Sequence, residues 1–444
     1  MALSGLDIYK LLPKTNCKDC GFATCLAFAM ALAQKRVSLD KCPHVSALAK
    51  EALEAASRPP VGLVTIGAGD DRIETGNELV MFRHEQKFFH PTAVGVLVDD
   101  TLDEEEVAAE VADINALHFE RAGQRLGVEL ICVGNSSRYK NRFVNTVRKV
   151  EASTSLNMAL MTRDAAALTE AVKICGARRP LLICEDVSTF GPFVSIAALN
   201  KLPIAVMAGD IEEAALLTEK AREAGVVDVI IGFKGKGISS RIQDFTLARR
   251  TALKKNAGAL GCPFIAFTES TDPEQELMEA VSYLCKYAGI LIIKNTDREY
   301  VFPLLVARQD IYQDPQKPVQ VEPGIYEIGR VAPDSPVLVT TNFSITYFTV
   351  ASEVESSKVP CRIVCCDAEG MSVLTAWAAE KFTAEKITDT LMKSGIENMV
   401  SRKKIVIPGY VSVLSGRLEE LSGWKVTVGP REASGIPAFM RNLK

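Results

Sequence analysis

The strongest constraint on the fold is a regular alternation of short apolar runs and amphipathic segments between Thr92 and about Arg308. Eight of these runs have the length and the Val, Ile and Leu content of buried β-strands. They cover residues 93–98, 128–133, 156–161, 180–184, 203–207, 227–231, 262–267 and 289–293. Segments such as 104–125, 163–175 and 212–224 follow them as expected helices. Eight strand–helix units over about 215 residues predict a (β/α)8 TIM barrel, with a doubly wound sheet as the competing arrangement.

Composition divides the rest of the chain. Residues 1–57 hold a cysteine cluster, and 58–91 are expected to be a linker and a β-hairpin, with strands at 61–66 and 78–82 and a turn at 75–77. The barrel would occupy 92–314. The segment 315–336 contains five prolines, which exclude a helix or a central strand and predict an extended, proline-rich linker. Residues 337–444 return to strand–helix alternation, with strands expected at 337–339, 362–366, 405–407 and 424–428.

The charge balance excludes several classes of function. Fifty-one Lys and Arg residues stand against 55 Asp and Glu, so the chain offers no basic field for nucleic acid and no polybasic membrane anchor. No apolar run approaches the ~20 residues of a membrane helix, and the first residues do not resemble a secretion signal. We therefore expect a cytoplasmic protein. The four histidines all lie at or before His118, which disfavours a histidine-rich zinc site or a Ser-His-Asp triad.

Polar residues follow the expected barrel strands, where barrel ligands bind. They are Asp99, Asp100, Asn135, Ser136, Arg163, Asp164, Glu185, Asp186, Gly209, Asp210, Lys234, Glu269, Lys294 and Asn295. Such residues can bind a polar substrate or act as general acid and base. Asp, Asn and Ser are equally the standard N-caps of the helices that follow, so both interpretations stay open.

Four of the twelve cysteines, Cys17, Cys20, Cys25 and Cys42, are spaced C-x2-C-x4-C-x16-C. In a cytoplasmic chain this cluster indicates metal ligands rather than disulfides. The single C-x-x-C pair and the Cys42-Pro43 step favour a [4Fe–4S] cluster over zinc, with unligated thiols as the third option. Thr24 is expected to cap a helix that begins at Cys25, whose positive end would favour the thiolate. The other eight cysteines mostly lie in apolar runs and are interpreted as small buried hydrophobic residues.

Four loops follow the expected strands of the C-terminal domain, at the edge where ligands bind in parallel sheets. They cover 340–346, 367–373, 408–410 and 429–435 and are rich in Gly, Ser and Thr. Backbone N–H groups and hydroxyls there suit a large ligand rimmed with amides, such as a corrin, as well as a phosphate. The absence of a P-loop lysine or a G-x-G-x-x-G run makes a nucleotide a weak prediction. Ordinary turn and cap usage remains the alternative.

The segment Leu-Pro-Lys-x-Asn-Cys-x-x-Cys-Gly-x-x-x-Cys-x-x-Phe-Ala, from Leu12 to Ala29, continues to Cys42-Pro43. In this it resembles the large (gamma) subunits of the corrinoid iron–sulfur protein, part of the acetyl-CoA decarbonylase/synthase system of the anaerobic acetyl-CoA (Wood–Ljungdahl) pathway of carbon fixation. The resemblance covers the whole chain and implies a cluster domain, a barrel and a Rossmann-like corrinoid-binding domain. It also implies that Cys17, Cys20, Cys25 and Cys42 ligate a [4Fe–4S] cluster.

The resemblance further implies that the C-terminal domain binds a cobamide, a cobalt-containing corrinoid of the cobalamin type. By position, the expected contacts are Thr340, Asn342, Thr346, Gly370, Met371, Ser372, Val373, Gly409, Ala433, Ser434 and Gly435. Because no histidine follows His118, the cobamide is expected to be base-off without a histidine ligand. The implied function is that of a methyl carrier in methyltransferase reactions, with no catalytic residue assigned. Co(I) would accept the methyl group of methyltetrahydrofolate or a related pterin and pass it to acetyl-CoA synthase, and the cluster would re-reduce Co(II).

Implied partners are the small (delta) subunit as a heterodimer, a methyltetrahydrofolate:corrinoid methyltransferase, acetyl-CoA synthase and, as a further candidate, a reductive activator. Movement between domains is expected at 58–60 and 315–336. The alternative function is a TIM-barrel pterin-dependent methyltransferase with an accessory cluster, in which Asp99, Asp186 and Asp210 would matter. A corrin-free electron-transfer adaptor is a third option.

Overall fold

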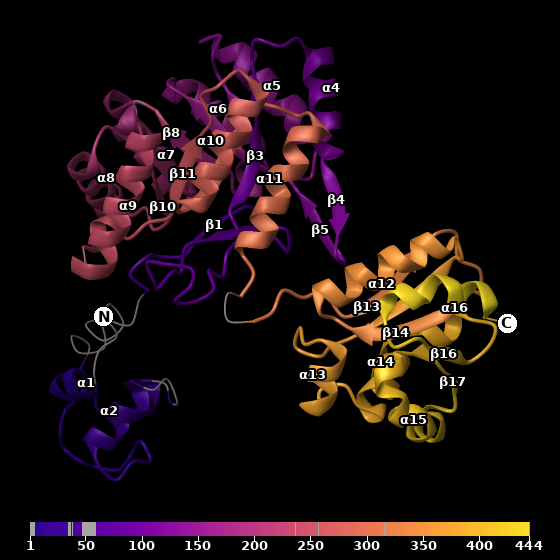
Figure 1. The fold of residues 1–444 in the computed structure, drawn as a ribbon. Coiled ribbons are helices and arrows are strands. Elements are labelled where there is room, and N and C mark those ends of the chain that lie inside the picture. The colour runs from indigo at the N-terminus through magenta and orange to yellow at the C-terminus, as the bar shows by residue number, and fades with distance from the viewer. Residues whose placement is uncertain are drawn as a thin grey trace. The chain divides into compact units, whose positions relative to one another are not determined.

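The computed structural model describes residues 5–33, 37, 39–46, 59–235, 237–255, 257–314 and 317–443. The chain forms two compact units, one of Met1–Leu117 and Val128–Tyr312 and the other of His118–Gly127 and Gln313–Lys444 (Figure 1). Residues 47–58, where the sequence predicts the end of the first domain and a junction, lie outside the described residues. Within the described part of the chain, no helix is long and apolar enough to cross a membrane.

The first unit contains a closed barrel of eight parallel strands, which confirms the predicted TIM barrel. The strands are β3 (Ala93–Asp99), β6 (Leu130–Gly134), β7 (Asn157–Thr162), β8 (Leu181–Cys184), β9 (Ile204–Ala208), β10 (Val229–Phe233), β11 (Phe264–Phe267) and β12 (Ala288–Ile293). Its helices are α4 (Glu104–Asn115), α5 (Lys140–Ser153), α6 (Ala165–Cys175), α7 (Phe190–Asn200), α8 (Ile211–Glu223), α9 (Ile238–Lys255), α10 (Pro273–Cys285) and α11 (Arg298–Ile311). The strands are buried on both faces, which explains why they appear in the sequence as continuous apolar runs.

A short hairpin packs against the interior core of the barrel. Its strands are β1 (Val64–Ile66) and β2 (Ile73–Thr75), so the expected second strand at 78–82 and the expected turn at 75–77 are wrong. The real connection contains Gly67 and Gly69, which both have left-handed φ angles. The Gly67 N–H donates to the Arg179 carbonyl, just before β8, at 2.9 Å. The hairpin therefore covers the N-terminal end of the barrel.

A second hairpin replaces part of an expected helix. The helix predicted at 104–125 ends at Asn115, and β4 (His118–Arg121) and β5 (Gln124–Gly127) follow it. The turn residues Ala122 and Gly123 have φ angles of 52° and 76°, the left-handed pair that a two-residue hairpin turn requires. This hairpin belongs to the second unit, where the Tyr326 hydroxyl donates to the Ala122 carbonyl at 3.3 Å.

The second unit contains a five-stranded sheet in the order β13-β15-β14-β16-β17. Strands β14 (Val337–Thr341), β15 (Cys361–Cys366), β16 (Lys404–Ile407) and β17 (Lys425–Val428) are parallel. Its helices are α12 (Ser344–Ser357), α13 (Val373–Ala378), α14 (Ala384–Ser394), α15 (Ser415–Ser422) and α16 (Ile436–Asn442), with 3-10 turns that include η6 (Gly409–Leu414) and η7 (Ala433–Gly435). One face packs on α12 and α16 and the other on α13, α14 and α15 (Figure 1).

The expected linker 315–336 contains a strand that the sequence analysis did not predict. Strand β13 (Gly324–Ile328) pairs antiparallel with β15 at one edge of the sheet. An edge strand tolerates neighbouring prolines, because only one of its sides needs backbone hydrogen bonds. The Val321 N–H also donates to the Asn342 carbonyl at 2.9 Å, so much of this extended segment is part of the second unit.

Candidate functional site

The four clustered cysteines lie on a tightly wound loop between two short helices, α1 (Gly5–Leu11) and α2 (Cys25–Ala33), and on the turn after η1 (Leu39–Lys41). Lys14, Asn16 and Lys18 have left-handed φ angles of 57°, 50° and 70°. Gly21 is also left-handed, and its N–H donates to the Lys18 carbonyl at 2.8 Å. Such a run turns backbone N–H groups toward one concave side, which suits an anionic group.

Cys25 stands at the positive end of α2, as predicted. The Thr24 hydroxyl accepts a hydrogen bond from the Ala27 N–H at 3.1 Å, which confirms Thr24 as the N-cap. The Asn16 side-chain oxygen accepts the Cys25 N–H at 2.8 Å, and the Asn16 N–H points at the Cys25 sulfur at 3.4 Å. A helix N-terminus and an N–H donor both stabilise a thiolate over a thiol.

Three of the four cysteines belong to the small apolar core of this segment. Cys25 and Cys42 are buried in it with Phe28, and Cys20 packs against it. Cys17 is exposed, and its sulfur lies within 4.8 Å of ligand atoms of Asp19 and His44. The His44 ring forms a 2.6 Å hydrogen bond with the Asp19 carboxylate, which lowers the pKa of Asp19. Four cysteine sulfurs from one short segment, with an N–H donor at Cys25, fit the donor set of a [4Fe–4S] cluster.

A second candidate site is a cavity of about 140 Å³ in the C-terminal unit. It lies between the carboxyl ends of β14 and β16. In the sheet, β15 lies on one side of β14 and β16 on the other, so the direction in which strands are added reverses here. This switch point is where open parallel sheets bind their ligands. Apolar side chains dominate the lining, which consists of Leu338, Val339, Thr340, Thr346, Val350, Val373, Val406, Ile407, Pro408, Tyr410, Gly429, Pro430, Arg431, Ala433 and Ile436.

One polar group of this lining has no partner among the described residues. The Thr340 hydroxyl oxygen is buried and forms no hydrogen bond. Such a group is costly in a folded protein unless a ligand or water satisfies it. At the opposite wall, the Gly409 N–H donates to the Pro430 carbonyl at 3.0 Å, and a Cβ on Gly409 would lie 2.6 Å from the Gly429 carbonyl oxygen. Only glycine lets these two loops approach so closely.

Comparisons with known proteins cover nearly the whole chain. The family model described as CO dehydrogenase/acetyl-CoA synthase delta subunit matches residues 63–440, and an Fe-S cluster family model matches residues 12–44. The corrinoid/iron-sulfur protein large subunit of Moorella thermoacetica is 44% identical over 99% of both chains. The chain belongs to the large (gamma) subunit family of corrinoid iron–sulfur proteins.

Other relatives of this family are similar over the same length. The acetyl-CoA decarbonylase/synthase complex subunit gamma of Methanothermobacter thermautotrophicus is 34% identical over 100% of this chain and 99% of its own. Among solved structures, the dihydropteroate synthase of Thermus thermophilus is 18% identical, covering 55% of this chain and 98% of its own with a TM-score of 0.40.

The structure distributes the expected corrinoid contacts between the cavity and its supporting loops. Thr340, Thr346, Val373 and Ala433 line the cavity. The Asn342 side-chain oxygen instead accepts the N–H groups of Ala368 and Gly370, at 2.9 and 3.1 Å, and so stabilises the loop after β15. Five other expected contacts, Met371, Ser372, Gly409, Ser434 and Gly435, lie in the flanking loops and are not part of the lining.

Sequence reasoning missed several residues of the lining. Tyr410 and Arg431 lie within the expected loops but are not among the predicted corrinoid contacts. The Tyr410 hydroxyl is hydrogen-bonded to Glu432, which raises the pKa of Tyr410. The sequence places Tyr410 directly after Gly409 and Arg431 directly after Pro430, within the expected ligand loops, and this position could have identified both residues. Val350 and Ile436 face the cavity from α12 and α16. Nothing in the sequence distinguishes them from ordinary apolar residues of amphipathic helices.

The carboxylates after the barrel strands mostly cap helices or loops. Asp164 accepts the Ala166 N–H in the first turn of α6, Asp210 accepts the Glu213 N–H in the first turn of α8, and Asp186 accepts the Ser188 N–H at 2.9 Å. Asp99 accepts the Thr101 N–H at 3.0 Å, and buried Asp100 accepts the Asn135 amide at 2.7 Å. The capping interpretation is therefore sufficient for these side chains. Seven of the eight other cysteines are buried, as expected, and Cys285 is exposed.

Proposed function

We propose that this chain is a methyl carrier of the anaerobic acetyl-CoA pathway, which receives the methyl group of methyltetrahydrofolate or a related pterin and delivers it to acetyl-CoA synthase. A bound corrinoid would supply the cobalt chemistry of methyl transfer, and a bound [4Fe–4S] cluster would supply single electrons. The observation that carries the proposal is the cavity at the switch point of the C-terminal sheet, with its unpaired Thr340 hydroxyl. The chain's own residues bind and orient both groups.

The size of the cavity limits which part of a corrinoid it can hold. A space of about 140 Å³ is far too small for the macrocycle but suits one flat aromatic group. We infer that Leu338, Val350, Val406 and Ile436 enclose the lower base of the nucleotide tail, and that the macrocycle lies over the loops after the strands. The Thr340 hydroxyl would then hydrogen-bond to the tail, which would remove the cost of burying it unpaired.

The same arrangement bears on the lower side of the cobalt. The last histidine of the sequence is His118, which lies in β4, and no histidine lines the cavity. A lower base held inside the sheet unit cannot coordinate the metal at the same time. We therefore propose that the chain binds its corrinoid base-off and provides no imidazole in place of the base.

The N-terminal loop would hold the electron-transfer group. Cys17, Cys20, Cys25 and Cys42 would ligate the iron atoms, and the α2 N-terminus would stabilise the thiolate of Cys25. Lys14, Lys18 and Lys41 stand on the same short segment and would offset the negative charge of a thiolate-ligated cluster. We propose that this cluster reduces cobalt that has become oxidised.

Exposed apolar side chains favour a protein partner at the ligand end of the sheet. Ile345 on α12, Trp377 on α13 and Val413 on η6 are 68%, 41% and 70% exposed, on elements that follow the carboxyl ends of β14, β15 and β16. Exposed large apolar groups on neighbouring elements mark interaction surfaces. We propose that the small (delta) subunit covers this side in a heterodimer, and that the methyltransferase, acetyl-CoA synthase and a reductive activator approach in turn.

Anaerobic purification followed by metal analysis and visible spectroscopy tests the proposal. We expect about four iron atoms and about one cobalt atom per chain, and a Co(I) absorption band after addition of a strong reductant. Electron paramagnetic resonance of the Co(II) state should show no nitrogen hyperfine coupling from a histidine. A colourless chain, or cobalt with an imidazole nitrogen ligand from the protein, would contradict it.

A further inference from the structure

A cavity of about 520 Å³ at the C-terminal end of the barrel is not used by the proposed function. Ligand pockets typically measure 300–1,000 Å³, and barrel enzymes bind their substrates at this end. We propose that this barrel mouth is a binding site for a small organic monoanion, a carboxylate attached to an apolar, aromatic-sized body. The proposal does not depend on the corrinoid or on the cluster.

The floor of the barrel mouth is apolar. Leu97, Met161, Met207 and Phe267 come from four different strands, line the cavity and are only partly buried. Below them, fully buried side chains such as Ile183 and Ile230 fill the barrel, so the floor is a solid surface rather than the entrance to a channel. Partly exposed apolar atoms at the bottom of a polar mouth gain free energy when an apolar body covers them.

The rim of the barrel mouth carries charged side chains of both signs. Its charged residues are Arg163, Lys234, Arg241 and Lys294 against Glu185, Asp186 and Glu269. Arg241 forms an ion pair with Glu269, and the Arg163 Nε lies 3.4 Å from a carboxylate oxygen of Glu185. Among the described residues, neither Lys234 nor Lys294 forms an ion pair, and the Lys294 ammonium donates only to the Glu269 carbonyl, at 2.8 Å.

The two lysines therefore provide the recognition chemistry. Each stands directly after a barrel strand, Lys234 after β10 and Lys294 after β12. Hydrogen bonds from Ser188 lower the pKa of Asp186, and the positive charge of Lys234 lowers it further, so the Lys234 ammonium lies close enough to act on this carboxylate of the mouth. An anionic group placed between the two ammonium groups would interact with both, while its apolar body rests on the floor.

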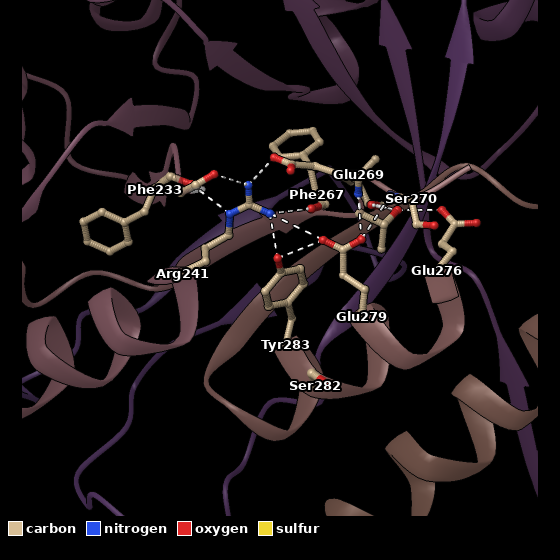
Figure 2. Close-up of polar contacts among 12 residues, drawn as sticks. Phe233, Arg241, Phe267, Glu269, Ser270, Glu276, Glu279, Ser282 and Tyr283 are labelled. Carbon is tan, nitrogen blue, oxygen red and sulfur yellow. Dashed lines mark hydrogen bonds and ion pairs between the residues drawn. The ribbon is translucent and has the colours of Figure 1, made fainter. Parts of the chain in front are cut away.

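Buried charged side chains fix the backbone of this rim (Figure 2). The Arg241 guanidinium, 4% exposed, donates to the carbonyls of Phe233 and Phe267, at 3.1 and 3.0 Å, and to the Tyr283 hydroxyl at 2.7 Å. Tyr283 in turn donates to Glu279 at 2.9 Å. A single buried side chain thus ties together the ends of β10 and β11.

Two glutamates continue this frame to β12. Glu279 accepts the N–H groups of Glu269 and Ser270, at 2.8 and 3.2 Å, and Glu276 accepts the Lys294 N–H at 2.7 Å. Burying ionised groups has a high desolvation cost, which an apolar core would avoid. Here these charges hold in place the backbone that carries Glu269 and Lys294. Preorganised polar groups of this kind are typical of binding sites and lower the entropic cost of capturing a ligand.

Calorimetric titration of the anaerobic, cofactor-loaded chain with 2-naphthoate tests the inference, with neutral 2-naphthamide as the matched probe. We expect saturable binding of about one naphthoate per chain, and about tenfold weaker binding of the amide, as loss of two partly exposed charge contacts implies. The Lys234→Gln/Lys294→Gln double variant should lose the same factor for naphthoate and none for the amide. Both substitutions are at exposed positions, so the fold should persist, which thermal melting verifies.

Lys220→Gln is the matched control, because Lys220 is an exposed lysine in the last turn of α8 and does not line the mouth. Its affinity for naphthoate should equal that of the unmodified chain. Absence of saturable binding, equal affinity for the amide, or unchanged affinity in the double variant would each overturn the proposal.

Discussion

Replacement of Thr340 by valine tests two effects of its hydroxyl separately: the stability that is lost by burying it unpaired, and the corrinoid affinity that it is proposed to provide. Thr340 is the last residue but one of β14, is 1% exposed, and its hydroxyl forms no hydrogen bond with any described residue. Valine keeps the shape of the side chain and removes the hydroxyl. Because a buried polar group without a partner costs about 1–3 kcal/mol, Thr340→Val should stabilise the corrinoid-free second unit by about 1 kcal/mol.

The same substitution should weaken corrinoid binding. If the hydroxyl bonds to the nucleotide tail, valine loses a hydrogen bond of about 1 kcal/mol and leaves a polar ligand atom unpaired, so affinity should fall about tenfold. Thr341→Val is the matched control. The Thr341 hydroxyl is also buried and unpaired, but its side chain points to the opposite face of the sheet and does not line the cavity. It should stabilise the unit without changing corrinoid affinity.

Two measurements on the full-length chain decide the matter. Hydrogen–deuterium exchange of β14 and β15 amides in the corrinoid-free chain should slow about fivefold in both variants, the factor that about 1 kcal/mol implies. Spectrophotometric titration with a cobamide then gives the affinities. The reasoning is refuted if Thr340→Val accelerates exchange, or if both variants bind the cobamide equally well.

Further predictions concern the other parts of the chain. Cys17→Ser should reduce iron content and leave cobalt content unchanged, measured by metal analysis, because the proposed cluster ligands and the candidate corrinoid cavity belong to different units. Gly409→Ala should cost about 1–3 kcal/mol in the second unit and reduce cobalt retention, because its Cβ would lie 2.6 Å from the Gly429 carbonyl oxygen. Asp186→Asn should leave methylation by an added methyltransferase intact, as a carrier requires; loss of methylation would favour a barrel enzyme. Burial raises the pKa of Glu78 to about 7, so the folded state binds a proton at Glu78 more tightly than the unfolded chain does. The free energy of unfolding should therefore decline as pH rises from about 4.5 through 7. Thermal melting across that range should show a flatter decline for Glu78→Gln.

The sequence was sufficient for the parts of the fold whose burial leaves a local pattern. The eight barrel strands are buried on both faces, so they stand out as apolar runs. The β4–β5 hairpin has short, half-exposed strands, and its Ala122-Gly123 turn lacks the usual Asn-Gly signal. Its stabilising contacts are with Glu322 and Tyr326, about 200 positions later, and no local pattern encodes them.

The candidate sites show the same division. The four candidate cysteine ligands can be selected from the sequence because their spacing and residue type are what cluster binding requires. In the candidate corrinoid cavity, Thr340 lies near the carboxyl end of β14 and Ala433 lies just after β17, at the edge where a parallel sheet binds ligands, so topology points to them. Val350 and Ile436 depend on how α12 and α16 dock on the sheet. Their role follows from tertiary packing, which a single sequence does not encode locally.

The docking of the β4–β5 hairpin changes where movement between the two units can occur. The sequence predicts a free hinge at 315–336, but residues 321–328 of that segment are hydrogen-bonded into the second unit. The hairpin adds two further chain crossings, at Leu117–His118 and Gly127–Val128, and Gln124 is fixed to Glu322 by a 2.8 Å hydrogen bond. Movement of the second unit would therefore involve all three chain connections between the units, or release of the hairpin from Tyr326 of β13. A hinge confined to 315–336 would leave the other two connections unchanged. Such a hinge is therefore incompatible with a β4–β5 hairpin that stays bound to the second unit.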